Sequence, residues 1–291
     1  MIRRLLFLLF ALALAGAPQA DAATKKKVTA AQPAPKQEPP QAYPAELAEG
    51  ALPPITAAAA LVADADTGVP LYEHNADEPR QVASTQKLLT ALIIAEDGNL
   101  DAMVRVEPSD TNAEPTKLYI KPGEIYRRSD LLRILLVKSM NDVARCLARD
   151  NAGSIEAFAS KMNAKARQLG MRNSHFVNPN GLPASGQYSS ARDMMRVALF
   201  AYRNRTIRNY VGLQKTTWRY NDGRVRQFEN TNKVLQRWPL CNGMKTGYTE
   251  GAGHCLISSA THGGRHVISV ILGDKEVWND SYRMLAWGLA R

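Results

Sequence analysis

The sequence predicts a mixed α/β (α+β) fold, in which an antiparallel sheet flanked by helices lies beside a mostly helical subdomain. Two strand patterns come first, a long helical block follows, and more strands and a helix close the chain. Strands that are separated in the sequence by a block of helices are typical of this class. The predicted strands of the main sheet are 58–65, 70–74, 243–247, 254–261 and 266–272.

The amino-terminal segment differs in composition from the rest. Residues 1–22 have the features of a secretory signal peptide: Arg3 and Arg4, a short apolar run, and small residues where cleavage would occur. The apolar run is about half of the roughly 20 residues that a spanning helix needs. Residues 23–54 are rich in Pro and Ala and indicate a linker. We therefore expect an exported domain over 55–291, with no transmembrane segment after cleavage.

The first half of this domain contains two strands and a core helix. Residues 58–65 are apolar, Asp66-Thr67-Gly68 indicates a turn, and 70–74 fits a returning strand. Residues 84–98 have a strong helical pattern whose apolar positions cover most of the circumference. A helix that is apolar nearly all round is buried in a core.

Further helices fill the middle of the sequence. Ser129-Asp130 fits an N-cap for a helix to residue 138, which is interrupted at 139–141 and resumes over 142–149. A helix over 154–168 is closed by Gly170, and the residues that follow to 183 indicate a loop. Ser190 to Asp193 resembles a capping box at the start of a helix that reaches about residue 202.

The last third returns to strand patterns. Residues 214–221 and 224–230 flank Asp222-Gly223, which predicts a β-hairpin. Gly263-Gly264 joins the last two sheet strands, and 275–290 is predicted to be the final helix.

Charge and cysteine content limit the partners. The net charge is +10, yet the Lys and Arg residues form no dense run with interleaved aromatics, so no nucleic-acid partner is expected. The five His residues show no metal-ligand spacing, and neither a metal nor another cofactor is expected. Cys241 and Cys255 either form a disulfide or, together with Cys146, are buried thiols; we favour the second.

Three short motifs indicate nucleophilic catalysis: Ser84-Thr85-Gln86-Lys87, Ser139-Met140-Asn141 and Lys245-Thr246-Gly247. Each is weak alone, and their order along the chain carries the argument. A serine hydroxyl needs a base within hydrogen-bond reach, and Lys87 lies one helical turn from Ser84. A lysine becomes a base when burial and a second cation lower its pKa, and Lys245 is the candidate for that cation.

The remaining motif residues fit substrate contacts. Ser139 would relay a proton to the leaving amine, and Asn141 would hold the substrate amide and orient the lysine. Lys245 would bind a free carboxylate of the substrate, with Thr246 adding a hydrogen bond. Gly247 would let the substrate approach the strand closely. The backbone N–H groups of Ser84 and Tyr248 would form the oxyanion hole.

From Ile55 onward the sequence resembles the low-molecular-mass penicillin-binding proteins, the group of D-alanyl-D-alanine carboxypeptidases and endopeptidases. The resemblance includes the three motifs and segments such as FVNPNGLP, SSARDMM, NTNKVL and GMKTGYTEGAGHCLISSA. It implies a β-lactamase/transpeptidase-like fold and the same roles for Ser84, Lys87, Ser139, Asn141 and Lys245. It also implies that the partners are stem peptides of peptidoglycan, and β-lactams that acylate the same serine and clear slowly.

The resemblance leaves the reaction type open. Larger members of the group carry a further β-domain and an amphipathic helix after the last helix predicted here, and we expect neither in this chain. That expectation favours a similarity to the shorter members of the group, which cut cross-links as endopeptidases. Two alternatives remain: a serine β-lactamase, for which Glu156 and Glu229 are poorly placed candidates for the extra glutamate, and a non-catalytic protein that binds peptidoglycan.

Overall fold

The computed structural model describes residues 50–52 and 54–291. The chain divides into two units, 1–40 and 41–291, and the fold described here belongs to the second. The predicted signal peptide and nearly all of the predicted linker lie outside the described residues. None of the helices in the described part is long and apolar enough to cross a bilayer.

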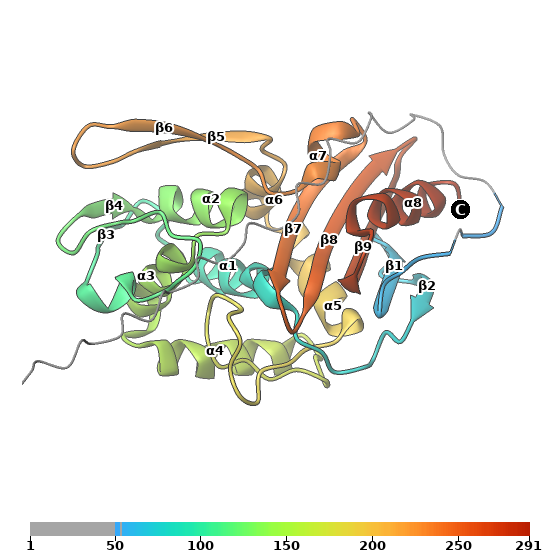
Figure 1. Ribbon diagram of the computed structural model, residues 1–291, viewed down its shortest axis with the longest axis horizontal. Helices are drawn as coiled ribbons and strands as arrows, with labels where there is room; N and C mark the ends of the chain where they lie inside the picture. The colour runs from blue at the N-terminus through green and yellow to red at the C-terminus, as the bar shows by residue number, and fades with distance from the viewer. Residues whose placement is uncertain (1–49, 53) are drawn as a thin grey trace, which may run out of the picture. The chain divides into compact units, whose positions relative to one another are not determined.

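A five-stranded antiparallel sheet forms the centre of this unit (Figure 1). Its order is β2-β1-β9-β8-β7, so β1 from the start of the domain pairs with β9 near its end. The prediction of an antiparallel sheet built from both ends of the domain is confirmed. The strands are β1 Ala59–Asp64, β2 Pro70–His74, β7 Cys241–Thr249, β8 Gly253–His262 and β9 Arg265–Asp274.

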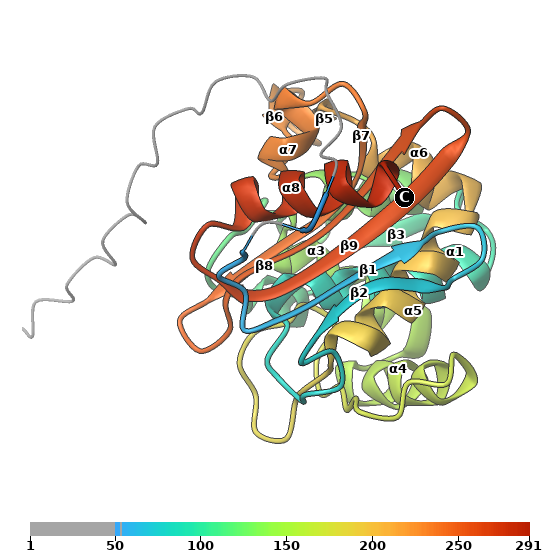
Figure 2. The same ribbon diagram turned by 90° about the vertical axis from the view of Figure 1, so that its right-hand side faces the viewer.

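Helices cover both faces of the sheet. The last helix, α8 (Val277–Leu289), packs on one face against β8 and β9, and α5 (Ala191–Arg203) packs on the other (Figure 2). The alternation along β1 explains this arrangement, because Leu61 belongs to the core beneath α5 and its neighbour Val62 to the core beneath α8. The sheet is therefore the middle layer of three.

The helical part contains four longer helices, of which α1 is the most buried. Every residue from Lys87 to Ile94 is buried, as the apolar pattern predicts. Ser139 ends the second helix in a left-handed conformation with φ of 68°. The predicted interruption is thus confirmed at residues 139 and 140, whereas the next helix begins at Asn141, one residue earlier than predicted. The helices are α1 Lys87–Glu96, α2 Arg128–Lys138, α3 Asn141–Ala152 and α4 Ile155–Gln168.

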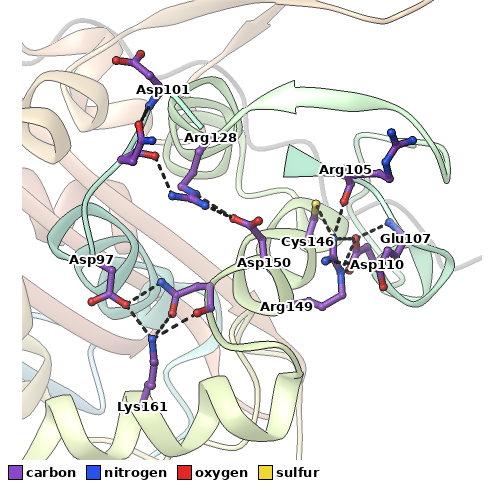
Figure 3. A network of polar contacts seen from close by, with 12 residues as sticks. Asp97, Asp101, Arg105, Glu107, Asp110, Arg128, Cys146, Arg149, Asp150 and Lys161 are labelled. Atoms are coloured by element: carbon purple, nitrogen blue, oxygen red, sulfur yellow. Dashed lines mark hydrogen bonds and ion pairs between the residues drawn. The ribbon is translucent and has the colours of Figure 1, made fainter. Parts of the chain in front are cut away.

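Ion pairs and hydrogen bonds connect α3 to its neighbours in the helical part (Figure 3). Arg149 of α3 forms an ion pair with Asp110 at 2.9 Å and donates to the backbone carbonyl of Arg105 at 2.6 Å. Arg128 forms an ion pair with Asp150 at 2.8 Å. The contacts of Arg149 thus connect the segment between α1 and α2 to α3, and the Arg128–Asp150 pair connects the start of α2 to α3.

Several short elements were not predicted. They are β3 Met103–Arg105, η2 Pro108–Thr111, β4 Ile125–Arg127, α6 Arg205–Val211 and α7 Lys233–Arg237. The predicted hairpin is confirmed as β5 Lys215–Arg219 and β6 Val225–Glu229.

Two predicted helix starts can be compared with the structure. The second helix begins at Arg128, and its N-cap, Arg127, makes no side-chain cap, so the predicted cap at Ser129-Asp130 is wrong. The backbone N–H of Ser129 instead donates to Leu100 O at 2.8 Å. The N-cap at Ser190 is confirmed by a hydrogen bond from Asp193 N at 3.2 Å.

The three cysteines are buried free thiols, as favoured from the sequence. Cys241 pairs with Ala260 in the sheet, whereas Cys255 pairs with Gly247. The two cysteines are therefore at opposite ends of the β7–β8 ladder, too far apart for a disulfide.

Candidate active site

A cleft of about 360 Å³ lies where the helical part meets the edge of the sheet at β7. Residues of all three sequence motifs line it. The lining also includes residues that the sequence analysis did not single out, among them Pro115, Thr116, Gly181, Thr231, His254 and Trp278.

Ser84 lies on a short 3₁₀ turn, η1 (Ala83–Gln86), immediately before α1. The sequence analysis began the α-helix at Ser84 itself, whereas the observed α-helix begins at Lys87. The turn forms because Ala83 takes a positive φ of 47° and the hydroxyl of Thr85 donates to Val82 O at 2.5 Å. This conformation leaves Ser84 partly exposed in the cleft while its neighbours Thr85 and Gln86 are buried.

Lys87 has a fully buried side chain whose amine meets three oxygen atoms. Its Nζ lies 2.7 Å from Ser84 Oγ, 2.8 Å from Asn141 Oδ1 and 2.6 Å from the carbonyl oxygen of Asn180. None of the three is a carboxylate. Burial lowers the pKa of Lys87 well below its usual value, and the charge of Lys245 lowers it further.

A neutral amine fits this arrangement. Two N–H groups can go to the carbonyl oxygens of Asn141 and Asn180, which leaves the nitrogen lone pair for the hydroxyl of Ser84. Asn180 O, 3.2 Å from Ser84 Oγ, is the alternative acceptor for the single hydroxyl proton. The nucleophile and the base predicted from the sequence are thus in direct contact.

The predicted loop before residue 183 supports this arrangement, a role that the sequence analysis did not predict. Three successive carbonyl oxygens, of residues 178, 179 and 180, accept hydrogen bonds from Gln86 at 2.6 Å, Thr90 at 2.7 Å and Lys87. Polar side chains of η1 and α1 therefore all donate hydrogen bonds to the backbone of one loop. The segment FVNPNGLP, which the sequence analysis treated only as loop and family resemblance, was the available signal.

Ser139 and Asn141 come from the junction between α2 and α3. The left-handed residue Ser139 turns the chain so that both side chains face the cleft. Asn141 is held on both sides: its Nδ2 donates to Pro115 O at 2.5 Å and its backbone N–H to Thr116 O at 2.9 Å. The amide oxygen is therefore fixed toward Lys87.

Lys245 lies behind the cleft wall. Its side chain is only 1% exposed, and its Nζ donates to Thr246 O at 3.0 Å. Burial lowers its pKa to about 7. Lys245 is thus close enough to influence Lys87, while the neighbouring residues Thr246, Gly247 and Tyr248 line the cleft itself.

Strand β7 lies directly against η1, the turn that carries Ser84 and is called the nucleophile turn below. A Cβ placed on Gly247 would lie 2.9 Å from Ser84 N and 3.0 Å from Thr85 N. Only glycine permits this approach without displacement. Tyr248, one residue on, is 54% exposed and stacks on His254 with ring centroids 4.6 Å apart.

Comparison with known proteins identifies the family. Residues 46–276 match the family model described as D-alanyl-D-alanine carboxypeptidase, peptidase family S11. The chain belongs to this family. Its members are serine-type peptidases, which agrees with the contact between Ser84 and Lys87.

Individual S11 relatives differ in how much of their length is matched. D-alanyl-D-alanine carboxypeptidase DacF of Bacillus subtilis is 34% identical over 222 residues, which are 75% of this chain and 57% of that protein. The D-alanyl-D-alanine endopeptidase of Escherichia coli is 30% identical over 285 residues, 95% of this chain and 84% of that protein. The chain thus spans little more than half of the first relative.

A solved structure of a similar protein supports the predicted fold class. The D-alanyl-D-alanine carboxypeptidase of Mycobacterium tuberculosis superposes with a TM-score of 0.79 at 30% sequence identity, covering 84% of this chain and 96% of that one. The resemblance to the penicillin-binding group is therefore confirmed in sequence and in fold.

Proposed function

We propose that this protein is a serine DD-peptidase that cleaves D-alanyl-D-alanine stem peptides of peptidoglycan through an acyl-enzyme on Ser84. One observation carries the proposal: the buried amine of Lys87 lies 2.7 Å from Ser84 Oγ, and no carboxylate of the described residues is among its hydrogen-bond partners. A buried amine with a lowered pKa can take the serine proton at neutral pH.

The reaction then proceeds in two stages. The hydroxyl of Ser84 gives its proton to Lys87 and attacks the penultimate D-alanine carbonyl. The N–H groups of Ser84 and Tyr248 stabilise the oxyanion, and Ser139 passes a proton to the departing amine. Water then attacks the ester and restores the free serine and the peptide acid.

Substrate binding is assigned to the residues around β7. Asn141 holds the substrate amide, and Lys245 and Thr246 bind the terminal carboxylate. The proposal for Lys245 is supported by its place directly behind Thr246. Close approach of the acyl chain is supported by the absence of a side chain at Gly247.

Location and inhibition follow from the family and the sequence. Export to the periplasm is supported by the signal-peptide pattern at 1–22. β-Lactams are proposed to acylate Ser84 and to clear slowly. No Asp or Glu is among the described residues that line the cleft, so no carboxylate there can activate a deacylating water as in class A β-lactamases.

Digestion of purified sacculi tests the proposed function, with products identified by mass spectrometry. We expect wild-type protein to release free D-alanine, monomers from cross-linked dimers, or both, and Ser84→Ala to release neither. Free D-alanine identifies a carboxypeptidase and monomers identify an endopeptidase. Binding of both proteins to sacculi without any release would instead support the non-catalytic alternative. Rapid turnover of nitrocefin would support the β-lactamase.

A further inference from the structure

One cation beside the cleft has no role in the proposed reaction. Lys233 is the first residue of α7, is half-buried, and has its Nζ 5.5 Å from the ring centroid of Trp278. Trp278 comes from α8 and lines the cleft. Within residues 50–52 and 54–291, Lys233 has no carboxylate partner.

The surroundings of Lys233 are positive. Lys138 lines the cleft, and Lys87 and Lys245 are buried next to the cleft. The described residues that line the cleft include no Asp or Glu. Like charges gathered in a partly desolvated groove repel one another and attract an anionic ligand. A planar aromatic ring beneath an ammonium also holds it in one place, which reduces the entropy lost when an anion binds.

An aromatic wall continues from this lysine toward the nucleophile. His254 stacks on Tyr248 and lines the same cleft. Burial lowers the pKa of His254, and the charge of Lys233 lowers it further. His254 is therefore neutral at pH 7, which leaves Lys233 as the cation at this part of the wall.

We propose that Lys233, supported by the Trp278 ring, binds a carboxylate of the peptide substrate. The proposal rests on the proposed peptidase function and adds a residue to its substrate site. The carboxylate has two possible sources: the α-carboxylate of the terminal residue, shared with Lys245 and Thr246, or a side-chain carboxylate of the stem peptide. Both sources offer the same charge and geometry to the ammonium.

Peptide affinity tests the proposal in the Ser84→Ala background, where turnover does not interfere. Lys233→Gln is expected to raise the dissociation constant of a stem peptide ending in D-alanyl-D-alanine by roughly tenfold, the loss typical of one charged hydrogen bond. Lys233→Arg is expected to keep most of the affinity. Lys275→Gln is the matched control, since Lys275 carries the same charge but is exposed and, within the described residues, lies over no aromatic ring of the cleft.

Two modified peptides separate the sources. If Lys233 binds the terminal carboxylate, amidation of that group removes the effect of Lys233→Gln on affinity. If it binds a side-chain carboxylate, amidation of that side chain removes the effect. An unchanged dissociation constant for the unmodified peptide after Lys233→Gln would overturn the proposal, as would an equal loss in Lys275→Gln. Failure of the proposed function would show differently, as wild-type protein that binds peptide but releases no product.

Discussion

The chemistry of the site depends on the environment of one amine. Lys87 is surrounded by neutral oxygen atoms and has a second lysine nearby, so both burial and charge favour its neutral form. An ammonium paired with a carboxylate would have kept its proton and could not act as a base. The residue types around Lys87 thus determine whether Ser84 becomes a nucleophile.

The titration of Lys245 should make the free energy of unfolding depend on pH. Burial lowers the pKa of Lys245 from 10.5 to about 7, so between pH 7 and about 8.5 the unfolded chain binds more protons than the folded one. The free energy of unfolding should therefore rise with pH in this window, by roughly 2 kcal/mol. Lys87 contributes in the same direction. Denaturant unfolding at several pH values measures the change.

Above about pH 8.5 the buried cysteines oppose this rise in the free energy of unfolding. Burial raises the pKa of Cys241 and Cys255 to about 12, so above about pH 8.5 the unfolded chain begins to lose thiol protons that the folded chain keeps. The unfolding free energy of Lys245→Met should rise less between pH 7 and about 8.5 than that of wild type. A flat wild-type curve, or an equal rise in the variant, would contradict the assignment.

At the residue scale, the sequence predicted side-chain functions better than backbone functions. The pair of Ser84 and Lys87 and the approach of Asn141 could be predicted because their spacing and chemistry are visible in the motifs. The carbonyl oxygen of Asn180 could not, because every residue has one. The burial of Lys245 was not predicted either, because the motif gives its residue type and not its exposure.

At the scale of elements, the nucleophile turn depends on the loop that packs against it. A Cβ on Gly181 would lie 2.1 Å from Ala83 O and 2.9 Å from Ser84 N, and Gly181 has a φ of 82°. Gly181→Ala should therefore displace Ser84 and lower the rate of acylation by a penicillin, by roughly a hundredfold for a shift of about 1 Å. Stopped-flow measurements of adduct formation give this rate.

Gly153→Ala provides the matched control. Gly153 has a φ of 83°, but a Cβ there would meet nothing within 4 Å. In both variants a left-handed alanine costs about 1 kcal/mol, and only Gly181→Ala adds the collision. Wild-type acylation rates in both variants would show that the loop does not position Ser84.

The elements that the sequence missed share a physical cause. The strands Met103–Arg105 and Ile125–Arg127 have three residues each, too few to show a period of two. The helices at 205–211 and 233–237 are equally hard to detect because they are short, although Asn204 and Asn232 do act as N-caps. Long, strongly patterned segments such as 84–98 were predicted correctly because their apolar residues reflect burial directly.

At the scale of the whole domain, the fold brings distant parts of the sequence to one cleft. The nucleophile turn follows β2, Ser139 and Asn141 lie between two helices, and Gly247 lies on the edge strand β7. The order of strands and helices predicted the sheet and the helical part. Their relative placement was not predictable from periodicity, because it depends on contacts such as the approach of Gly247 to Ser84.

The central claim is that neutral Lys87 activates Ser84, and covalent labelling by a fluorescent penicillin tests it most directly. Wild-type protein should acquire one adduct, mapped to Ser84 by mass spectrometry, and Ser84→Ala none. Lys87→Met, which keeps the site filled without an amine, should fold and label at least about a hundredfold more slowly. Labelling of either variant at the wild-type rate would contradict the account.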